Sequence, residues 1–285
     1  MISKTPKISV IMASYNGAAT LPRAIESFRA QTYPAKELIV IDGGSTDDTA
    51  NILKSYDEWI HYSASEPDKG ILDAWNKGLK HITGDWVYFQ GADDLYYDET
   101  VFANMVEHLV AHEAESKVIY GVLQRVNLRG EFVEWLGKPW NAARFREFGM
   151  CIPHTATFQH RSLFEEYGEF NADSPIGSPY EFFLRYLKDH DAVFVPVVVA
   201  SMIIGGESNR PENLLTFVRE DRRAQRKHGT LKSNIWILSR SVTFVKAYLK
   251  YVLSKFLPNN FYWWTLDFIR MMRGRRRMYS WRSLE

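Results

Sequence analysis

Short apolar runs alternate along the first half of the chain with segments whose apolar positions recur at helical spacing. Each run ends at a turn or at polar residues, which indicates buried strands joined by helices. The predicted strands are residues 8–13, 38–41, 59–63 and 85–89. The predicted helices are residues 21–31, a segment through 52 and 53, 70–82 and 101–112. Strands that alternate with helices of this length predict βαβ units and a mainly parallel sheet.

The second half of the chain continues with fewer regular signals. Residues 117–126 and 132–136 read as strands joined by a turn at Arg129 and Gly130, which predicts a hairpin. Further strands are expected at residues 154–159 and at the β-branched run 193–200, and further helices at 180–188 and 211–228.

The chain of 285 residues is long enough for one large α/β domain and an appendage. Its single cysteine, Cys151, excludes an internal disulfide and an all-cysteine metal site, which is typical of a reducing compartment. The first residues have no signal-peptide pattern, and no uninterrupted apolar run is long enough for a transmembrane helix.

The net charge of +1 conceals an uneven distribution along the chain. From Arg222 to the end there are 15 lysines and arginines against two acidic residues, so the preceding part is acidic. We therefore expect two regions with different partners: a main domain over residues 1–228 and a basic helical extension over residues 229–285.

Three polar clusters follow the predicted strands: residues 13–16 (Ala-Ser-Tyr-Asn), 42–45 (Asp-Gly-Gly-Ser) and 92–94 (Ala-Asp-Asp). In a parallel sheet the carboxyl ends of the strands meet at one edge, where ligands bind. Adjacent carboxylates repel each other unless a cation lies between them, so Asp93 and Asp94 indicate a divalent metal. A solvated loop or a helix N-cap is the alternative for this pair. Neither a P-loop nor a dinucleotide-binding glycine motif is present.

Four segments, residues 9–16, 39–47, 65–78 and 91–94, resemble the family 2 glycosyltransferases. The resemblance covers roughly residues 7–220. It implies the α/β GT-A fold, which is Rossmann-like, with a mainly parallel central sheet and helices on both faces. Residues 65–78 are similar to a branch active in bacterial exopolysaccharide and lipid-linked oligosaccharide assembly.

The resemblance also implies roles for individual residues. It places Ala13, Tyr15, Asp42, Asp68, Lys69 and Asp93 at the nucleotide-sugar donor. Tyr15 would pack on the nucleobase, and Asp42 would accept a hydrogen bond from it. Asp94 would bind Mn²⁺ or Mg²⁺ at the diphosphate. The alternatives are a rim aromatic for Tyr15, a turn-forming residue for Asp42 and a solvated cation for Lys69.

Inverting sugar transfer requires a general base at the acceptor hydroxyl. In the family this is an acid at the start of a helix, but the matching position here is Pro179, which cannot take a proton. We expect Glu181 to be the base, with Asp173 in reserve, although Glu181 could simply favour the helix dipole. His154 falls where the family often has a histidine near the acceptor, and a purely structural role is the alternative.

The extension combines aromatic residues with cations. Residues 261–264 (Phe-Tyr-Trp-Trp) precede a run of arginines over residues 270–277. Such a pattern is typical of helices lying on an anionic membrane surface. Helices packed on the main domain or on a second copy of the chain, as a homo-oligomer, are the alternative. Nucleic acid is disfavoured because the acidic main domain would repel it.

The sequence thus predicts a metal-dependent, inverting glycosyltransferase, with a UDP-sugar as the first choice of donor. Its acceptor would be lipid-linked or a polysaccharide, and it would act in cell-surface glycan synthesis at the cytoplasmic face of the membrane. A catalytically silent scaffold that binds nucleotide sugar is the alternative, which the Pro179 departure favours.

Overall fold

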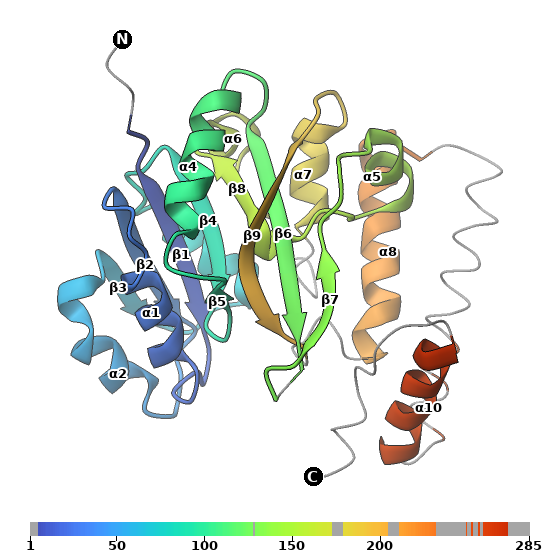
Figure 1. The fold of residues 1–285 in the computed structure, drawn as a ribbon, viewed down its shortest axis with the longest axis horizontal. Helices are drawn as coiled ribbons and strands as arrows, with labels where there is room; N and C mark the ends of the chain where they lie inside the picture. The colour runs from blue at the N-terminus through green and yellow to red at the C-terminus, as the bar shows by residue number, and fades with distance from the viewer. Residues whose placement is uncertain are drawn as a thin grey trace.

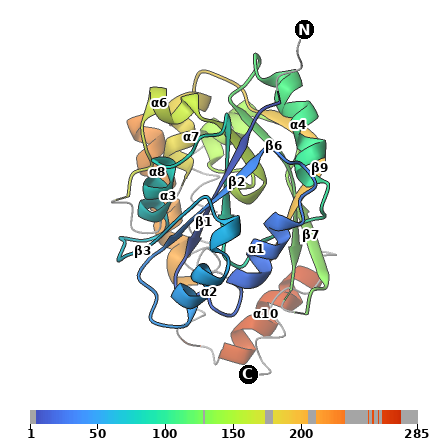
Figure 2. The same ribbon diagram turned by 90° about the vertical axis from the view of Figure 1, so that its left-hand side faces the viewer.

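The structure is a computed structural model that describes residues 5–127, 129–172, 179–204, 211–231 and 259–272, together with Leu249, Val252 and Phe256. Its centre is a nine-stranded sheet in the order β3-β2-β1-β4-β8-β6-β9-β5, with β7 paired to β6. Helices cover both faces of this sheet (Figures 1 and 2).

The first half of the sheet is parallel. It contains β1 (Ile8–Ser14), β2 (Lys36–Asp42), β3 (Tyr62–Ser65) and β4 (Trp86–Gly91). Ser14 at the end of β1 is in register with Asp42 at the end of β2. Ala13 is in register with Gly91 at the end of β4. The polar clusters that follow these three strands therefore do meet at one edge, as the sequence predicts.

The second half of the sheet is mixed. It contains β5 (Leu95–Tyr96), β6 (Val118–Val126), β7 (Phe132–Leu136), β8 (Thr157–His160) and β9 (Val193–Ile203). Strand β8 is antiparallel to both β4 and β6, and β9 is parallel to β6. The predicted hairpin is present as the antiparallel pair β6–β7, with Gly130 at a positive φ of 76° in its turn.

The helices lie in two layers. One layer holds α1 (Leu21–Arg29), α2 (Thr49–Ser55) and α4 (Val101–His112). The opposite layer holds α3 (Ile71–Leu79), α5 (Ala142–Phe148), α6 (Ser162–Tyr167), α7 (Tyr180–Leu187) and α8 (Pro211–Lys227). Two 3₁₀ turns, Asp57–Trp59 and His154–Ala156, and helix α10 (Asn259–Met272) complete the described elements.

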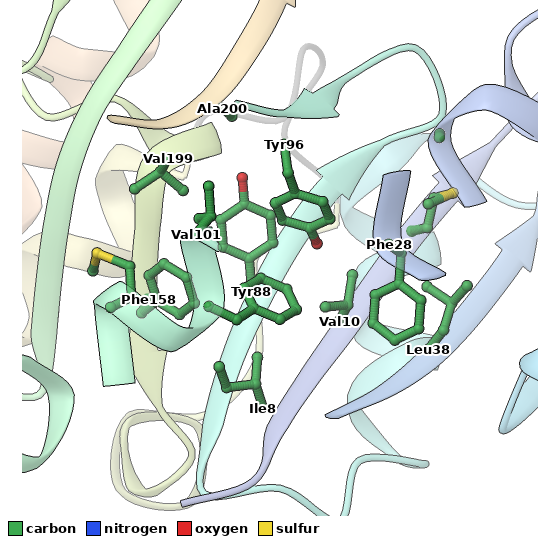
Figure 3. Packing of buried hydrophobic residues seen from close by; sticks show 14 of the residues in the cluster. Ile8, Val10, Phe28, Leu38, Tyr88, Tyr96, Val101, Phe158, Val199 and Ala200 are labelled. Carbon is green, nitrogen blue, oxygen red and sulfur yellow. The ribbon is translucent and has the colours of Figure 1, made fainter. Parts of the chain in front are cut away.

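Alternate residues of the central strands face the two layers, because successive side chains of a strand point to opposite faces. On β1, Ile8, Val10 and Met12 join the cluster under α1 and α4, whereas Ile11 joins the cluster under α3 and α7. Figure 3 shows the first cluster, in which Tyr88 packs between Tyr96 and Phe158. Burial on both faces explains why these strands read as continuous apolar runs.

The α/β fold class is confirmed, and the structure adds that pairing beyond β4 is mixed. The expected strand at residues 59–63 is instead the 3₁₀ turn Asp57–Trp59 followed by β3. Of the extension, α10 packs with Leu266 and Asp267 buried, and its Arg270 lies 3.7 Å from Glu134 on β7. The division at residue 228 stays a prediction. None of the described helices has both the length and the apolar character needed to cross a bilayer.

Candidate active site

A cavity of about 600 Å³ opens at the carboxyl ends of β1 and β2. Its walls come from the two strand ends, the segment after β3 and the first turn of α3. The lining residues are Ala13, Ser14, Tyr15, Gly43, Gly44, Pro67, Asp68, Gly70, Ile71 and Ala74. Three of the six expected donor-binding residues, Ala13, Tyr15 and Asp68, therefore share one cavity.

The loops at the rim of the cavity are tied together by side-chain to backbone hydrogen bonds. Ser45 accepts a bond of 2.7 Å from the Asn16 nitrogen, and the Asn16 side chain accepts one of 2.9 Å from the Thr46 nitrogen. Asp47 accepts a further bond of 3.0 Å from the Ala18 nitrogen. Asn16 has a positive φ of 49°, which asparagine tolerates better than most residues. These bonds hold the ends of β1 and β2 in one fixed arrangement.

Tyr15 projects from this rim with 67% of its surface exposed. An aromatic side chain so exposed at the mouth of a cavity offers a flat face for a planar ligand group. Tyr15 is therefore an exposed aromatic residue at the mouth of the cavity, and its stacking on a base stays a prediction.

Asp42 lies beneath the cavity and is fully buried. Its carboxylate accepts hydrogen bonds from the Ser45 nitrogen at 2.9 Å and from the Ser65 hydroxyl at 2.6 Å, and also from the Ser45 hydroxyl. These donors fix the turn after β2 to the end of β3. Asp42 thus shapes the floor of the cavity, and its side chain does not line it.

Asp68 packs against Gly43, the residue that follows β2. A Cβ atom on Gly43 would lie 2.7 Å from Asp68 Oδ2, so glycine at position 43 makes room for this carboxylate. Asp68 Oδ1 accepts a bond of 2.8 Å from the nitrogen of Gly70, the residue before α3. Lys69 is exposed and does not line the cavity. The first turn of α3 lines the same space, and the N-terminus of a helix favours an anion.

Asp93 and Asp94 converge over Gly91 at the end of β4. A Cβ atom at position 91 would lie 2.9 Å from both Asp93 Oδ1 and Asp94 Oδ2. Asp93 is exposed and Asp94 is buried. Burial, followed by the charge of Asp93, raises the pKa of Asp94 to about 7. Two converging carboxylate oxygens over a glycine, one of them poorly hydrated, fit a divalent cation. Across the described ranges, no three histidine, cysteine or acidic residues are grouped as a metal site.

His154 lies in an aromatic cage rather than in the cavity. Its ring stacks on Trp75 of α3 and on Phe89 of β4, with centroid distances of 4.7 and 5.5 Å. Burial lowers the pKa of His154 to about 3, so the ring is neutral at physiological pH. This neutral ring connects α3, which lines the cavity, to the start of β8.

Glu181 is held in an ion-pair cluster between α7 and α8. Its carboxylate lies 2.6 Å from Arg185, 2.8 Å from Lys227 and 2.8 Å from His228. Despite partial burial, hydrogen bonds from these three partners lower the pKa of Glu181 to about 2. A carboxylate this weakly basic and this tightly held is poorly suited to accept a proton. In the structure, Glu181 instead joins α7 to the end of α8 through its ion pairs.

Asp173, the reserve base, lies outside the described residues. The structure also adds residues that the sequence reasoning passed over. Ile71 is 42% exposed and lines the cavity, although it begins an otherwise amphipathic helix. The signal available in the sequence was an apolar residue, Ile71, directly after Gly70 at the start of a predicted helix.

Comparison with known proteins identifies the family. The sequence profile of Glycosyl transferase family 2 matches residues 9–168. An uncharacterised glycosyltransferase of Mycobacterium tuberculosis is 32% identical over 221 residues, which are 76% of this chain and 82% of that protein. A protein of Mycobacterium bovis named PGL/p-HBAD biosynthesis glycosyltransferase is 33% identical over 215 residues, 72% of this chain and 80% of that protein.

Solved structures share the fold at low sequence identity. TarS of S. aureus in complex with UDP has a TM-score of 0.61 and 15% identity, with 94% of this chain and 78% of that chain covered. The mannosyltransferase PcManGT of Pyrobaculum calidifontis, in complex with GDP-Man and Mn²⁺, has a TM-score of 0.57 and 19% identity, with 86% and 70% covered. With the family profile spanning the cavity and Asp94, and with relatives matched over most of their length, this chain belongs to glycosyl transferase family 2 and is a glycosyltransferase.

Proposed function

We propose that this glycosyltransferase transfers a sugar, with inversion, from a nucleotide-diphosphate donor to a lipid-linked or polysaccharide acceptor in cell-surface glycan synthesis. The observation that carries the proposal is the cavity at the ends of β1 and β2, together with the converging carboxylates of Asp93 and Asp94. A UDP-sugar is the first donor to test, because TarS is described with UDP and with UDP-GlcNAc. The naming of one group of relatives for PGL/p-HBAD biosynthesis supports a glycan-building role.

Within the cavity, each residue has a separate task in the proposal. Tyr15 stacks on the nucleobase, while Asp42 sets the floor on which the base rests. The N-terminal turn of α3 faces the diphosphate, which its N–H groups favour. Asp68 and Lys69 flank that side, and Asp93 contacts ribose or the donor sugar.

The proposal includes a divalent cation, Mn²⁺ or Mg²⁺, held by Asp94 with Asp93 beside it. When bound, it neutralises the charge on the departing nucleoside diphosphate. The Mn²⁺ in the PcManGT complex supports this part of the proposal. Asp94 contributes by presenting a partly dehydrated carboxylate, which binds a cation more strongly than a solvated one would.

The acceptor hydroxyl needs a base, and two carboxylates are candidates. Glu181 is the weaker one, because hydrogen bonds from Arg185, Lys227 and His228 lower its pKa to about 2. We therefore propose Asp173 as the base to test first and Glu181 as a clasp that positions α7 against α8. His154, neutral and held by Trp75, would shape the acceptor side without exchanging a proton.

Two exposed aromatic side chains favour a sugar-bearing acceptor. Tyr97, three residues after Asp94, and Trp135 on β7 are 45% and 47% exposed, with ring centroids 6.3 Å apart. The sheet brings them together from distant parts of the sequence, with the nitrogen of Tyr97 donating to the Val199 carbonyl of β9. Two large exposed rings side by side, one of them three residues after Asp94, form a suitable platform for the acceptor.

We also propose that the C-terminal extension lies on the cytoplasmic face of an anionic membrane. On α10, Phe261, Trp264, Phe268 and Met272 are exposed, and the first three stack on one another along the helix. Arg270 ties this helix to β7. Exposed aromatic residues beside cations suit the interface between lipid and water. A second copy of the chain is the competing partner for this surface.

A panel of UDP-, GDP- and dTDP-sugars, with and without Mn²⁺, tests the central proposal. We expect one nucleotide to raise the melting temperature in a metal-dependent way and to be slowly hydrolysed. Binding without turnover, even with a lipid-linked acceptor present, would instead support the silent scaffold. The absence of binding by every nucleotide would contradict both readings.

A further inference from the structure

Helix α8 carries a stripe of arginines that the proposed reaction does not use. Arg219, Arg222, Arg223 and Arg226 line a second cavity of about 280 Å³. This volume is several times the roughly 30 Å³ that a water molecule occupies in the liquid. Among the described residues, arginines alone form its wall.

The stripe faces away from the packed side of α8. Val218, Ala224 and Gln225 are buried, and Gln225 donates to the Tyr180 hydroxyl of α7. With 3.6 residues per turn, the four arginines fall within an arc of about 100° on the other side of the helix. Figure 1 shows α8 at the margin of the fold beside α5 and α7, across the sheet from α1 and α2. The cavity of the stripe shares no lining residue with the donor cavity, so the two are separate.

The four arginines of the stripe outnumber the two acids on the same stretch of α8, Glu220 and Asp221. Glu181 of α7 is engaged by Arg185 and by Lys227 and His228, which directly follow Arg226. Arg219, Arg223 and Arg226 make no ion pair within the described part of the chain. Like charges three and four residues apart on a helix repel each other, so α8 tolerates an unfavourable arrangement here.

A bound oxyanion would turn that repulsion into attraction. Guanidinium groups present several N–H donors in a plane and bind phosphate oxygens in pairs, which a point charge cannot do. We propose that the arginine stripe of α8 is a binding site for phosphate groups, distinct from the donor cavity. The phosphate could belong to an acidic lipid headgroup or to a free or substrate-borne diphosphate, and both present the same oxygens.

The test uses the full-length protein and a double variant, Arg223→Gln with Arg226→Gln. Glutamine is nearly as good a helix former as arginine, so α8 should persist, which circular dichroism checks. The matched control is Lys54→Gln with Lys80→Gln, which removes the same charge from exposed positions on α2 and after α3. Both proteins are compared with the wild type in two arms, at about physiological ionic strength.

In the first arm, inorganic diphosphate is titrated by calorimetry with EDTA present, so that no metal can draw it to Asp94. In the second, sedimentation is measured with phosphatidylcholine vesicles with and without phosphatidylglycerol. We expect the arginine variant to bind one of these ligands about tenfold more weakly or worse, while the control matches the wild type. Loss in the first arm identifies a free or substrate-borne phosphate, and loss only in the second identifies the headgroup.

Two results would overturn the proposal. One is an equal loss in the arginine variant and the lysine control, which would mean that only net charge matters. The other is a wild-type protein that binds neither ligand. Neither result depends on nucleotide-sugar turnover, so this proposal can fail while the proposed function stands.

Discussion

The carboxylate of Asp94 folds back over Gly91, with its Oδ2 atom 3.4 Å from the Gly91 nitrogen. Gly91 is not among the glycines with positive φ, so its own backbone does not demand glycine. Glycine is required at position 91 because Asp93 and Asp94 each place a carboxylate oxygen 2.9 Å from where a Cβ atom would lie. A small residue at the end of β4 thus sets the geometry of the carboxylate pair.

Gly91→Ala should weaken metal binding while the chain still folds. The added methyl group would push both carboxylates out of position, and such displacements typically cost about 10–100-fold in metal affinity. Titration of activity with Mn²⁺ measures the effect. Gly130→Ala, in the distant β6–β7 turn, is the control and should leave the metal dependence intact. Unchanged Mn²⁺ affinity in Gly91→Ala would contradict the metal site.

Asp94→Asn should abolish turnover and the metal-dependent part of nucleotide binding. Asparagine keeps the shape of the side chain but lacks the charge that the cation requires. We expect a loss of at least about 100-fold in kcat, with a melting temperature no lower than that of the wild type, because a buried charge has been removed. The exposed Asp57→Asn serves as the control. A variant with wild-type turnover would exclude Asp94 as the metal ligand.

Tyr15→Ala should reduce nucleotide affinity without affecting stability. Its ring is mostly exposed, so its removal costs little folding energy, whereas the lost stacking should weaken binding by about tenfold. Calorimetry with the preferred nucleotide measures the change, and Tyr15→Phe should retain most of the affinity. Equal affinities for wild type and Tyr15→Ala would remove Tyr15 from the donor site.

Glu181→Gln should destabilise the protein and change its response to acid. The pKa of Glu181 is about 2 in the folded chain, below the roughly 4.3 of an unfolded glutamate. The stability it contributes is therefore complete above about pH 4.3 and is lost as the pH falls towards 2. We expect the variant to melt earlier than the wild type at pH 7, with the difference shrinking towards pH 2.

Glu181→Gln also distinguishes a positioning role of Glu181 from a role as the general base. A positioning role predicts a fall in kcat of less than about tenfold, whereas loss of a general base typically costs about 10²–10⁴-fold. Glu165→Gln, which breaks an exposed pair with Arg161, is the stability control. A collapse of kcat with an unchanged melting temperature would return Glu181 to the catalytic role.

Trp135→Ala should raise the KM for the acceptor and leave donor hydrolysis unchanged. The ring is about half exposed and lies on β7, whereas the donor cavity is built from β1, β2 and α3. Steady-state kinetics with each substrate varied in turn separates the two effects. A matched rise in the donor KM would show that the aromatic pair does not act on the acceptor alone.

The sequence predicts β1, β2 and β4 of the parallel half well because these strands are buried on both faces. Residues 8–13 and 85–89 become β1 and β4 with changes of one or two residues at their ends. The short helices α5 and α6, of seven and six residues, are too brief to show helical periodicity. The antiparallel pairing of β8 with β4 is equally hidden, because strand direction is set by tertiary contacts and not by local pattern.

Some residues of the candidate site can be placed from the sequence, whereas the roles of others depend on tertiary packing. Tyr15 directly follows β1 and Asp94 comes three residues after the end of β4, so their place at the sheet edge can be read from the chain. The role of Glu181 could not, because Lys227 and His228 come 46 and 47 residues later and reach it only once α7 and α8 have packed. The cage around His154 likewise depends on Trp75, which belongs to a different helix.

The hydrogen bonds that join the Asn16 and Ser45–Asp47 loops have a thermodynamic consequence for ligand recognition. Because these loops are already ordered, a nucleotide entering the cavity should surrender little chain entropy from the protein. We accordingly expect the nucleotide to associate fast, with little conformational change in the loops around the base. The fixed shape of the cavity should then select which nucleotide binds. Slackening the loops by Asn16→Ala would then slow recognition through an entropic penalty, even though no ligand contact is removed.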